Sequence, residues 1–111
     1  MGIDAPDKGH VCGDGWDAGK AAADYLTSLV GFKPVSCDLK ASSIPGGPFA
    51  VCKVDGQDLS AAMASAGMAW AAPKIADYSV QASNAMYALS GVYAHPCVKA
   101  WEWRARNQPK Q

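Results

Sequence analysis

The stretch that decides the fold is KPVSCDLKASSIPGGPFAVCKVDGQDL, residues 33–59. Apolar and polar side chains alternate in both of its halves, and Cys37 and Cys52 each fall on the apolar phase. Alternation with a period of two is typical of β-strands. Glycine, proline and serine dominate residues 41–48 between the halves. We therefore predict a long antiparallel hairpin closed by that loop.

The hairpin cysteines favour a disulfide, because two inward-facing cysteines on paired strands lie within bonding reach. Closing a loop of this length stabilises a fold by roughly 3 kcal/mol on the chain-entropy model. The alternative is that Cys37 and Cys52 are free thiols that pack as small hydrophobic side chains.

Length and charge set limits on the class of protein. The chain of 111 residues is half apolar, which is enough for the core of one domain. Ten basic and ten acidic residues cancel, so no strong general attraction to nucleic acid or to an anionic membrane is expected. The only arginines are Arg104 and Arg106.

Four cysteines in a small domain favour an oxidising compartment, so we expect a periplasmic or secreted protein. No basic and apolar leader follows Met1, so an export signal would have been removed or left out. No apolar run is long enough to span a membrane. We expect a domain over residues 1–104 and a polar tail over 105–111.

Helical spacing of apolar residues predicts three helices. Asp14 or Asp17 can cap the first, and Asp58 can cap the second. The predicted helices cover residues 18–30, 59–66 and 77–89. Residues 68–70 are predicted to be a short buried extended segment, and the aromatic-rich residues 92–104 to close the domain.

Six short motifs occur in a characteristic order. They are Gly2-Ile3-Asp4-Ala5-Pro6-Asp7, Gly19-Lys20-Ala21-Ala22, Val51-Cys52-Lys53-Val54-Asp55-Gly56-Gln57-Asp58-Leu59, Ala66-Gly67-Met68-Ala69, Gly91-Val92-Tyr93 and Trp101-Glu102-Trp103-Arg104. Their order and spacing resemble the staphylococcal nuclease-like (thermonuclease) family, and the hairpin cysteines resemble its exported bacterial branch. The resemblance implies an α+β fold, an OB-fold barrel with three helices, and in active members a calcium-dependent cleavage of DNA or RNA.

The resemblance also implies an incomplete barrel. Family members begin with about three barrel strands, and only the end of the third is expected here. The hairpin would then keep an unpaired edge, which invites pairing with a second chain. We therefore expect either a homodimer joined along that edge or a partly open sheet.

The site residues come from the resemblance. Asp4 and the carbonyl of Ala5 match the family's calcium ligands, and Asp7 stands in place of the catalytic glutamate. Asp7 is one methylene shorter, so its carboxylate would fall about 1 Å short of a catalytic water, which can lower the rate around a hundredfold. The alternative is that Asp4 and Asp7 are turn residues flanking Pro6 in the loop after a strand, where aspartate is common without any catalytic role.

Two arginines complete the site in active family members, because a guanidinium matches phosphate oxygens. The first would precede Met1, and Gly47 stands at the second. Lys8, Lys40 or Lys53 could substitute, but lysine lacks the fork geometry. We therefore expect a catalytically impaired domain that acts as a binding module. The alternative is a calcium-dependent nuclease completed by missing strands or by a partner chain.

Two His-x-Cys pairs, His10-Val11-Cys12 and His95-Pro96-Cys97, form a second group of candidate site residues. If Cys12 and Cys97 form a disulfide, His10 and His95 are brought close to it. The alternatives are unpaired thiols or a tetrahedral zinc site made of His10, Cys12, His95 and Cys97.

The tryptophans near the C-terminus allow two interpretations. Trp101 and Trp103 beside Arg104 and Arg106 could hold single-stranded nucleic acid weakly. Alternatively, one tryptophan packs on the core while the other shields the barrel mouth.

Overall fold

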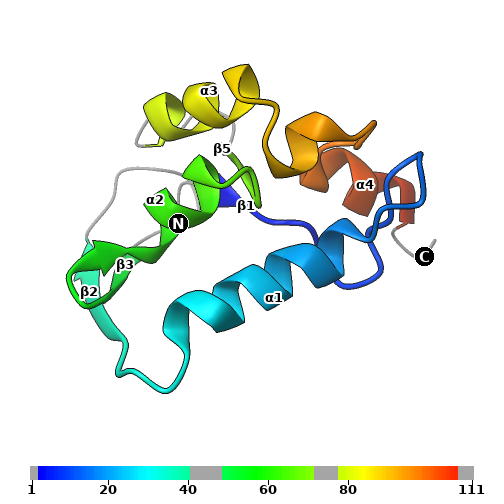
Figure 1. The fold of residues 1–111 in the computed structure, drawn as a ribbon. Coiled ribbons are helices and arrows are strands. Elements are labelled where there is room, and N and C mark those ends of the chain that lie inside the picture. Colours follow the sequence, from blue (N-terminus) through cyan, green and yellow to red (C-terminus); the bar gives the residue numbers. More distant parts are fainter. Residues whose placement is uncertain (1–2, 41–48, 72–77, 108–111) are drawn as a thin grey trace.

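The chain folds as an α+β protein in the computed structural model, which describes residues 3–40, 49–71 and 78–107 (Figure 1). The described part contains four α-helices, a short 3₁₀ helix and two small antiparallel sheets. The expected count of three helices is therefore wrong, and the described strands do not close into a barrel. None of the helices in these ranges is both long and apolar enough to cross a bilayer.

The first sheet is the predicted hairpin with one added strand. Its strands, in spatial order, are β2 (Ser36–Lys40), β3 (Phe49–Val54) and β4 (Gln57–Asp58). Cys37 lies directly opposite Cys52, and the two form a disulfide, as predicted. Asp55 and Gly56 adopt positive φ values of 52° and 79° in the turn from β3 to β4, the conformation that a tight hairpin turn requires.

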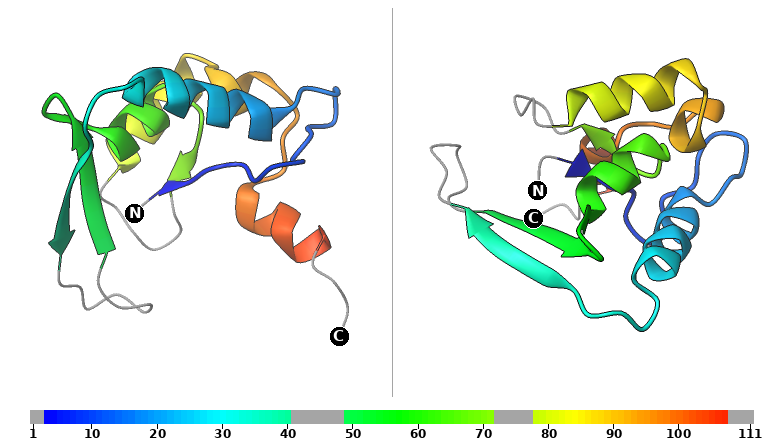
Figure 2. Two further views of the ribbon diagram at one scale, coloured as in Figure 1. Left: turned by 90° about the horizontal axis from the view of Figure 1, so that it is seen from below. Right: turned by 60° about the vertical axis from the view of Figure 1, so that its left-hand side comes forward.

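The loop predicted over residues 41–48, including Gly47, lies outside the described residues. Only one end of the hairpin packs on the rest of the molecule: Val54 is buried, whereas Leu39 is 76% exposed. The expectation that the apolar phase faces inward is therefore wrong for Leu39. In the views of Figure 2, the hairpin lies at the periphery.

Helix α1 (Ala18–Val30) has the predicted bounds. Asp17 rather than Asp14 is its N-cap, because the Asp17 carboxylate accepts a hydrogen bond of 3.0 Å from the backbone N–H of Lys20. Such a cap satisfies one of the otherwise unpaired N–H groups of the first turn. Gly31 ends the helix with a φ of 55°.

Helix α2 (Leu59–Ser65) starts at Asp58, as predicted, and the carboxylate of Asp58 accepts from the N–H groups of Ser60 and Ala61. The same carboxylate accepts a 2.7 Å hydrogen bond from the hydroxyl of Tyr78. Tyr78 directly precedes α3 (Ser79–Tyr87). One aspartate therefore both caps α2 and links it to the start of α3.

Helix α3 is shorter than predicted. Ala82 and Ala85 are buried, as the apolar spacing indicated, but Met86 and Leu89 are exposed. The segment after α3 packs directly against the backbone of Gly67. A Cβ at Gly67 would overlap the carbonyl oxygen of Ser90, which follows α3. The backbone N–H of Val92 also donates to the Gly67 carbonyl.

The second sheet pairs β1 (Ile3–Asp4) with β5 (Trp70–Ala71). Two apolar clusters lie on either side of this pair. One contains Ala22, Met63 and Ala69 between α1 and α2, and the other contains Trp70, Val92 and Ala100. The second sheet thus lies at the centre of the molecule (Figure 1). Asp4 is the last residue of β1.

The closing segment contains more helix than predicted. A 3₁₀ helix covers Gly91–Ala94, and α4 covers Ala100–Asn107. Helix α4 therefore extends past Arg104, into the region expected to be a polar tail. Its formation brings a side chain of α4 to the site described next.

Candidate functional site

The candidate site begins where β1 ends. Asp4 lies opposite Trp70 in the β1–β5 pair, and the chain then turns through Ala5 and Pro6 to Asp7. The backbone of Asp7 packs directly against α1, since a Cβ at Gly19 would overlap the Asp7 carbonyl oxygen. A glycine is therefore needed here for the loop and the helix to approach each other. This contact fixes the loop that carries both carboxylates.

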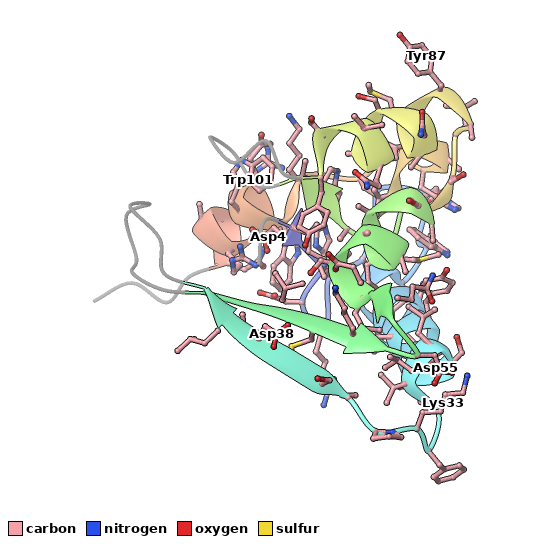
Figure 3. All side chains as sticks on the ribbon, turned by 90° about the vertical axis from the view of Figure 1, so that its left-hand side faces the viewer. Asp4, Lys33, Asp38, Asp55, Tyr87 and Trp101 are labelled. Carbon is pink, nitrogen blue, oxygen red and sulfur yellow. A yellow bond between two sulfur atoms is a disulfide. The ribbon has the colours of Figure 1, made fainter. Side chains whose placement is uncertain are left out.

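Arg104 of α4 bridges these two carboxylates. Its Nη1 donates to Oδ1 of Asp7 at 3.2 Å, and its Nη2 donates to Oδ2 of Asp4. The hydrogen bond to Asp4 is the main cause of a raised pKa for Arg104. Figure 3 shows Asp4 close to the α4 segment that carries Trp101. The expectation that no arginine stands at this site is therefore wrong, because Arg104 reaches both aspartates.

The residues around Asp4 do not fit a calcium ion in this arrangement. Calcium takes six to eight oxygen ligands, usually including several carboxylates. Here one carboxylate oxygen of Asp4 and one of Asp7 accept N–H groups of a fixed cation. Within residues 3–40, 49–71 and 78–107, no three side chains of His, Cys, Asp or Glu gather at one point. The guanidinium thus places one positive charge between the two carboxylates.

His10 lies behind this site and is completely buried, with 0% of its surface exposed. Its ring is stacked between Trp70, at a centroid distance of 5.8 Å, and Trp103, at 5.0 Å. Neither ring nitrogen makes a hydrogen bond of good geometry within the described part of the chain, although the backbone of Val98 interacts with the ring and acts to raise its pKa. Burial is the main cause of a lowered pKa for His10, since an imidazolium ion is poorly solvated there.

Cys12 and Cys97 form the second disulfide, which ties the loop before α1 to the segment before α4. Their sulfur atoms are bonded to each other and cannot be thiolate ligands. The zinc site considered for His10, Cys12, His95 and Cys97 is therefore wrong for this oxidised form. The alternative of unpaired thiols is also wrong, because no described cysteine is free.

His95 differs from His10 in its surroundings. Its Nδ1 lies 2.6 Å from Oδ2 of Asp14, and its ring stacks on Trp16 at a centroid distance of 4.1 Å. The hydrogen bond from His95 is the main cause of a lowered pKa for Asp14. The carboxylate of Asp14 therefore orients the imidazole of His95, which lies two residues before Cys97 in the chain.

A hollow of about 560 Å³ lies beside the Arg104 bridge, and we call it the α4 hollow. It is lined by Asp7, Trp101, Trp103, Arg104, Ala105 and Asn107. Trp103 also stacks on His10 and so contributes to the interior, whereas Trp101 is half-buried with Lys99 Nζ 5.6 Å from its ring centroid. Trp103 packs on His10, as the packing interpretation expected of one tryptophan, and Trp101 borders the α4 hollow. Weak binding of nucleic acid at these tryptophans stays a prediction.

Comparison with known proteins gave no match to any family model or to any curated protein. The function is therefore argued from the geometry of the site and from the motifs quoted above.

Sequence reasoning missed the Arg104 bridge and the stacking of His10. A partial signal for the bridge was present, because Trp103 and Arg104 are adjacent and the chain has few arginines. When Trp103 stacks on His10, the adjacent Arg104 comes within reach of Asp4. The sequence did not show that α4 forms or on which side it packs.

Proposed function

We propose that this chain is a staphylococcal nuclease-like domain that binds another macromolecule and does not hydrolyse it. The ordered motifs support the family, and the α+β arrangement is compatible with it. On this proposal the β2–β3–β4 sheet and the β1–β5 pair are parts of an OB-fold barrel. The two disulfides support an exported protein in a periplasmic or extracellular setting.

The observation that carries the proposal is the bridge from Arg104 to Asp4 and Asp7. Family chemistry, as the resemblance implies it, needs Asp4 free to bind a metal and the residue at Asp7 free to handle a water. The carboxylate oxygens that accept the N–H groups of Arg104 are occupied by those contacts and are not free to coordinate a metal or to orient a water. The bridge therefore opposes both roles at once.

The partner that the α4 hollow fits best is a short single strand of nucleic acid. Bases stack on exposed aromatic rings without sequence preference, and nearby cations contact the phosphates. Trp101 supplies the ring, and Lys99 places an ammonium group beside it. The net charge of zero and the few cations beside the hollow imply weak binding with a shallow dependence on salt, because the salt slope scales with the number of phosphate contacts.

The alternative function is a calcium-dependent nuclease, and the same arginine supports it. In that case Arg104 would leave one or both carboxylates when substrate binds and would stabilise charge on the phosphate instead. Missing strands or a partner chain would complete the metal site.

A cleavage assay on single-stranded DNA separates the two functions. The protein is incubated with labelled oligonucleotide in calcium and, separately, in chelator, and binding is followed by fluorescence anisotropy. We expect no chelator-sensitive cleavage and weak binding that persists in chelator. We expect Trp101→Ala to weaken this binding, while Tyr87→Ala, at an exposed tyrosine on α3, leaves it unchanged. Cleavage that chelator abolishes would establish the nuclease instead.

A further inference from the structure

The outer edge of β2 is the clearest unpaired feature of the fold. The sheet order is β2-β3-β4, so among the described strands β2 pairs only with β3. Figures 2 and 3 show β2 at the outside of the hairpin, with Asp38 on it. The backbone N–H and C=O groups along that edge can form hydrogen bonds with another strand.

The apolar phase of β2 is also uncovered. Leu39 is 76% exposed and Val35, just before the strand, is 43% exposed. Both share the phase of Cys37, whose disulfide to Cys52 crosses to β3. Farther along the same face, Val54 is buried, so the apolar face continues from the core to an exposed end. A second strand beside β2 would extend this face.

The charges of β2 identify the strand that fits. We propose that β2 pairs antiparallel with β2 of a second copy, with the two-fold axis at Leu39. This register sets Asp38 of each copy opposite Lys40 of the other, and it sets Leu39 opposite Leu39. Opposite charges at facing positions stabilise antiparallel strands, and like charges destabilise them.

Other symmetric registers within the strand are less favourable. An axis at Asp38 sets that aspartate against its own copy, and an axis at Lys40 sets two lysines against each other. An axis at Cys37 sets Asp38 opposite Ser36, with no opposite charge. A pairing between identical strands closes on itself about a two-fold axis, so the result is a dimer and not a filament. The charge pattern thus favours a second copy over an unrelated chain.

The test is a set of charge exchanges followed by analytical ultracentrifugation of the full chain. Wild type is expected to show a concentration-dependent monomer–dimer equilibrium. Asp38→Lys and Lys40→Asp should each raise the dimer dissociation constant at least tenfold, because each sets like charges opposite one another. The double variant Asp38→Lys/Lys40→Asp should restore it to near the wild-type value. Lys53→Asp, on β3, changes the net charge as Lys40→Asp does and should leave the dimer intact.

A covalent readout checks the register independently. Under oxidising conditions Leu39→Cys should form a disulfide-linked dimer, because the two residues 39 face each other across the axis. A monomer at all concentrations would overturn the proposal. So would a dimer that the single exchanges leave intact, or one that the double exchange does not restore. Neither Asp38 nor Lys40 belongs to the site at Asp4, so these outcomes leave the proposed function unaffected.

Discussion

The two ends of the molecule use the same covalent link but differ in packing. At the aromatic end, the Cys12–Cys97 disulfide lies beside a buried cluster that includes Trp70 and His10. At the hairpin end, the Cys37–Cys52 disulfide joins two strands that leave Leu39 exposed. The aromatic end is therefore expected to contribute most of the stability and the site, while the hairpin end offers a surface.

Removing each disulfide gives the largest expected difference between the ends. The Cys12–Cys97 link spans 85 residues and the Cys37–Cys52 link spans 15. On the chain-entropy model, replacing the first pair by alanine costs about 4.5 kcal/mol and replacing the second about 3 kcal/mol. Urea unfolding of the two double variants measures both values. If replacing Cys37 and Cys52 lowered the free energy of unfolding more than replacing Cys12 and Cys97, the expected difference between the two ends would be contradicted.

An isosteric substitution sharpens the contrast in packing. Val92 is buried at the aromatic end and Val35 is half-exposed near the hairpin. Val92→Thr places a hydroxyl in an apolar cluster and should lower the free energy of unfolding by about 1–3 kcal/mol. Val35→Thr should change it by less than about 0.5 kcal/mol. Thermal or urea unfolding of the two variants checks this, and equal losses would show that the hairpin face is covered.

The burial of His10 should make the stability of the fold depend on pH. Burial lowers the pKa of His10, so the unfolded chain binds a proton that the folded chain does not. Stability is then complete above about pH 6.5 and falls as the pH drops below it, by at most about 1.4 kcal/mol per pH unit. Asp7 and Arg104 shift this pKa in opposite directions, upward and downward respectively.

His10→Phe keeps a ring between the tryptophans and should remove this pH dependence, while His95→Phe should keep it. The chain has only these two histidines, so urea unfolding between pH 7 and pH 5 assigns the effect. A dependence that survives His10→Phe would contradict the burial argument. Any stability that comes from the lowered pKa of Asp14 is lost only at lower pH, as that carboxylate is protonated.

The smallest expected effect concerns the Arg104 bridge. The side chains of Arg104 and Asp7 are both more than two-fifths exposed, so solvent screens the pair. Arg104→Ala should lower the free energy of unfolding by only about 1 kcal/mol, and less in high salt. Arg106→Ala is the matched control on the same helix. An equal loss in both variants would mean that the bridge adds no stability.

Local patterns in the sequence predicted the local elements well. The cap at Asp17, the cap at Asp58 and the facing pair of Cys37 and Cys52 all follow from near neighbours in the chain. The position of Arg104 depends on contacts across almost the whole chain, to Asp4 and Asp7. No period or cap in the sequence specifies such a contact.

Burial was harder to predict than secondary structure. Leu39 and Met86 have the spacing of core residues but lie exposed, because no described element covers that side of β2 or of α3. His10 shows the opposite error, since a polar residue in a glycine-rich loop is fully buried between two indoles.

Calcium binding to the wild-type chain, measured by isothermal titration calorimetry, tests the central claim most directly. The account predicts no saturable heat at millimolar calcium, because Arg104 already pairs with both Asp4 and Asp7. Saturable binding of one calcium ion per chain that is lost in Asp4→Asn would contradict this account. It would show that calcium displaces the guanidinium of Arg104 from Asp4.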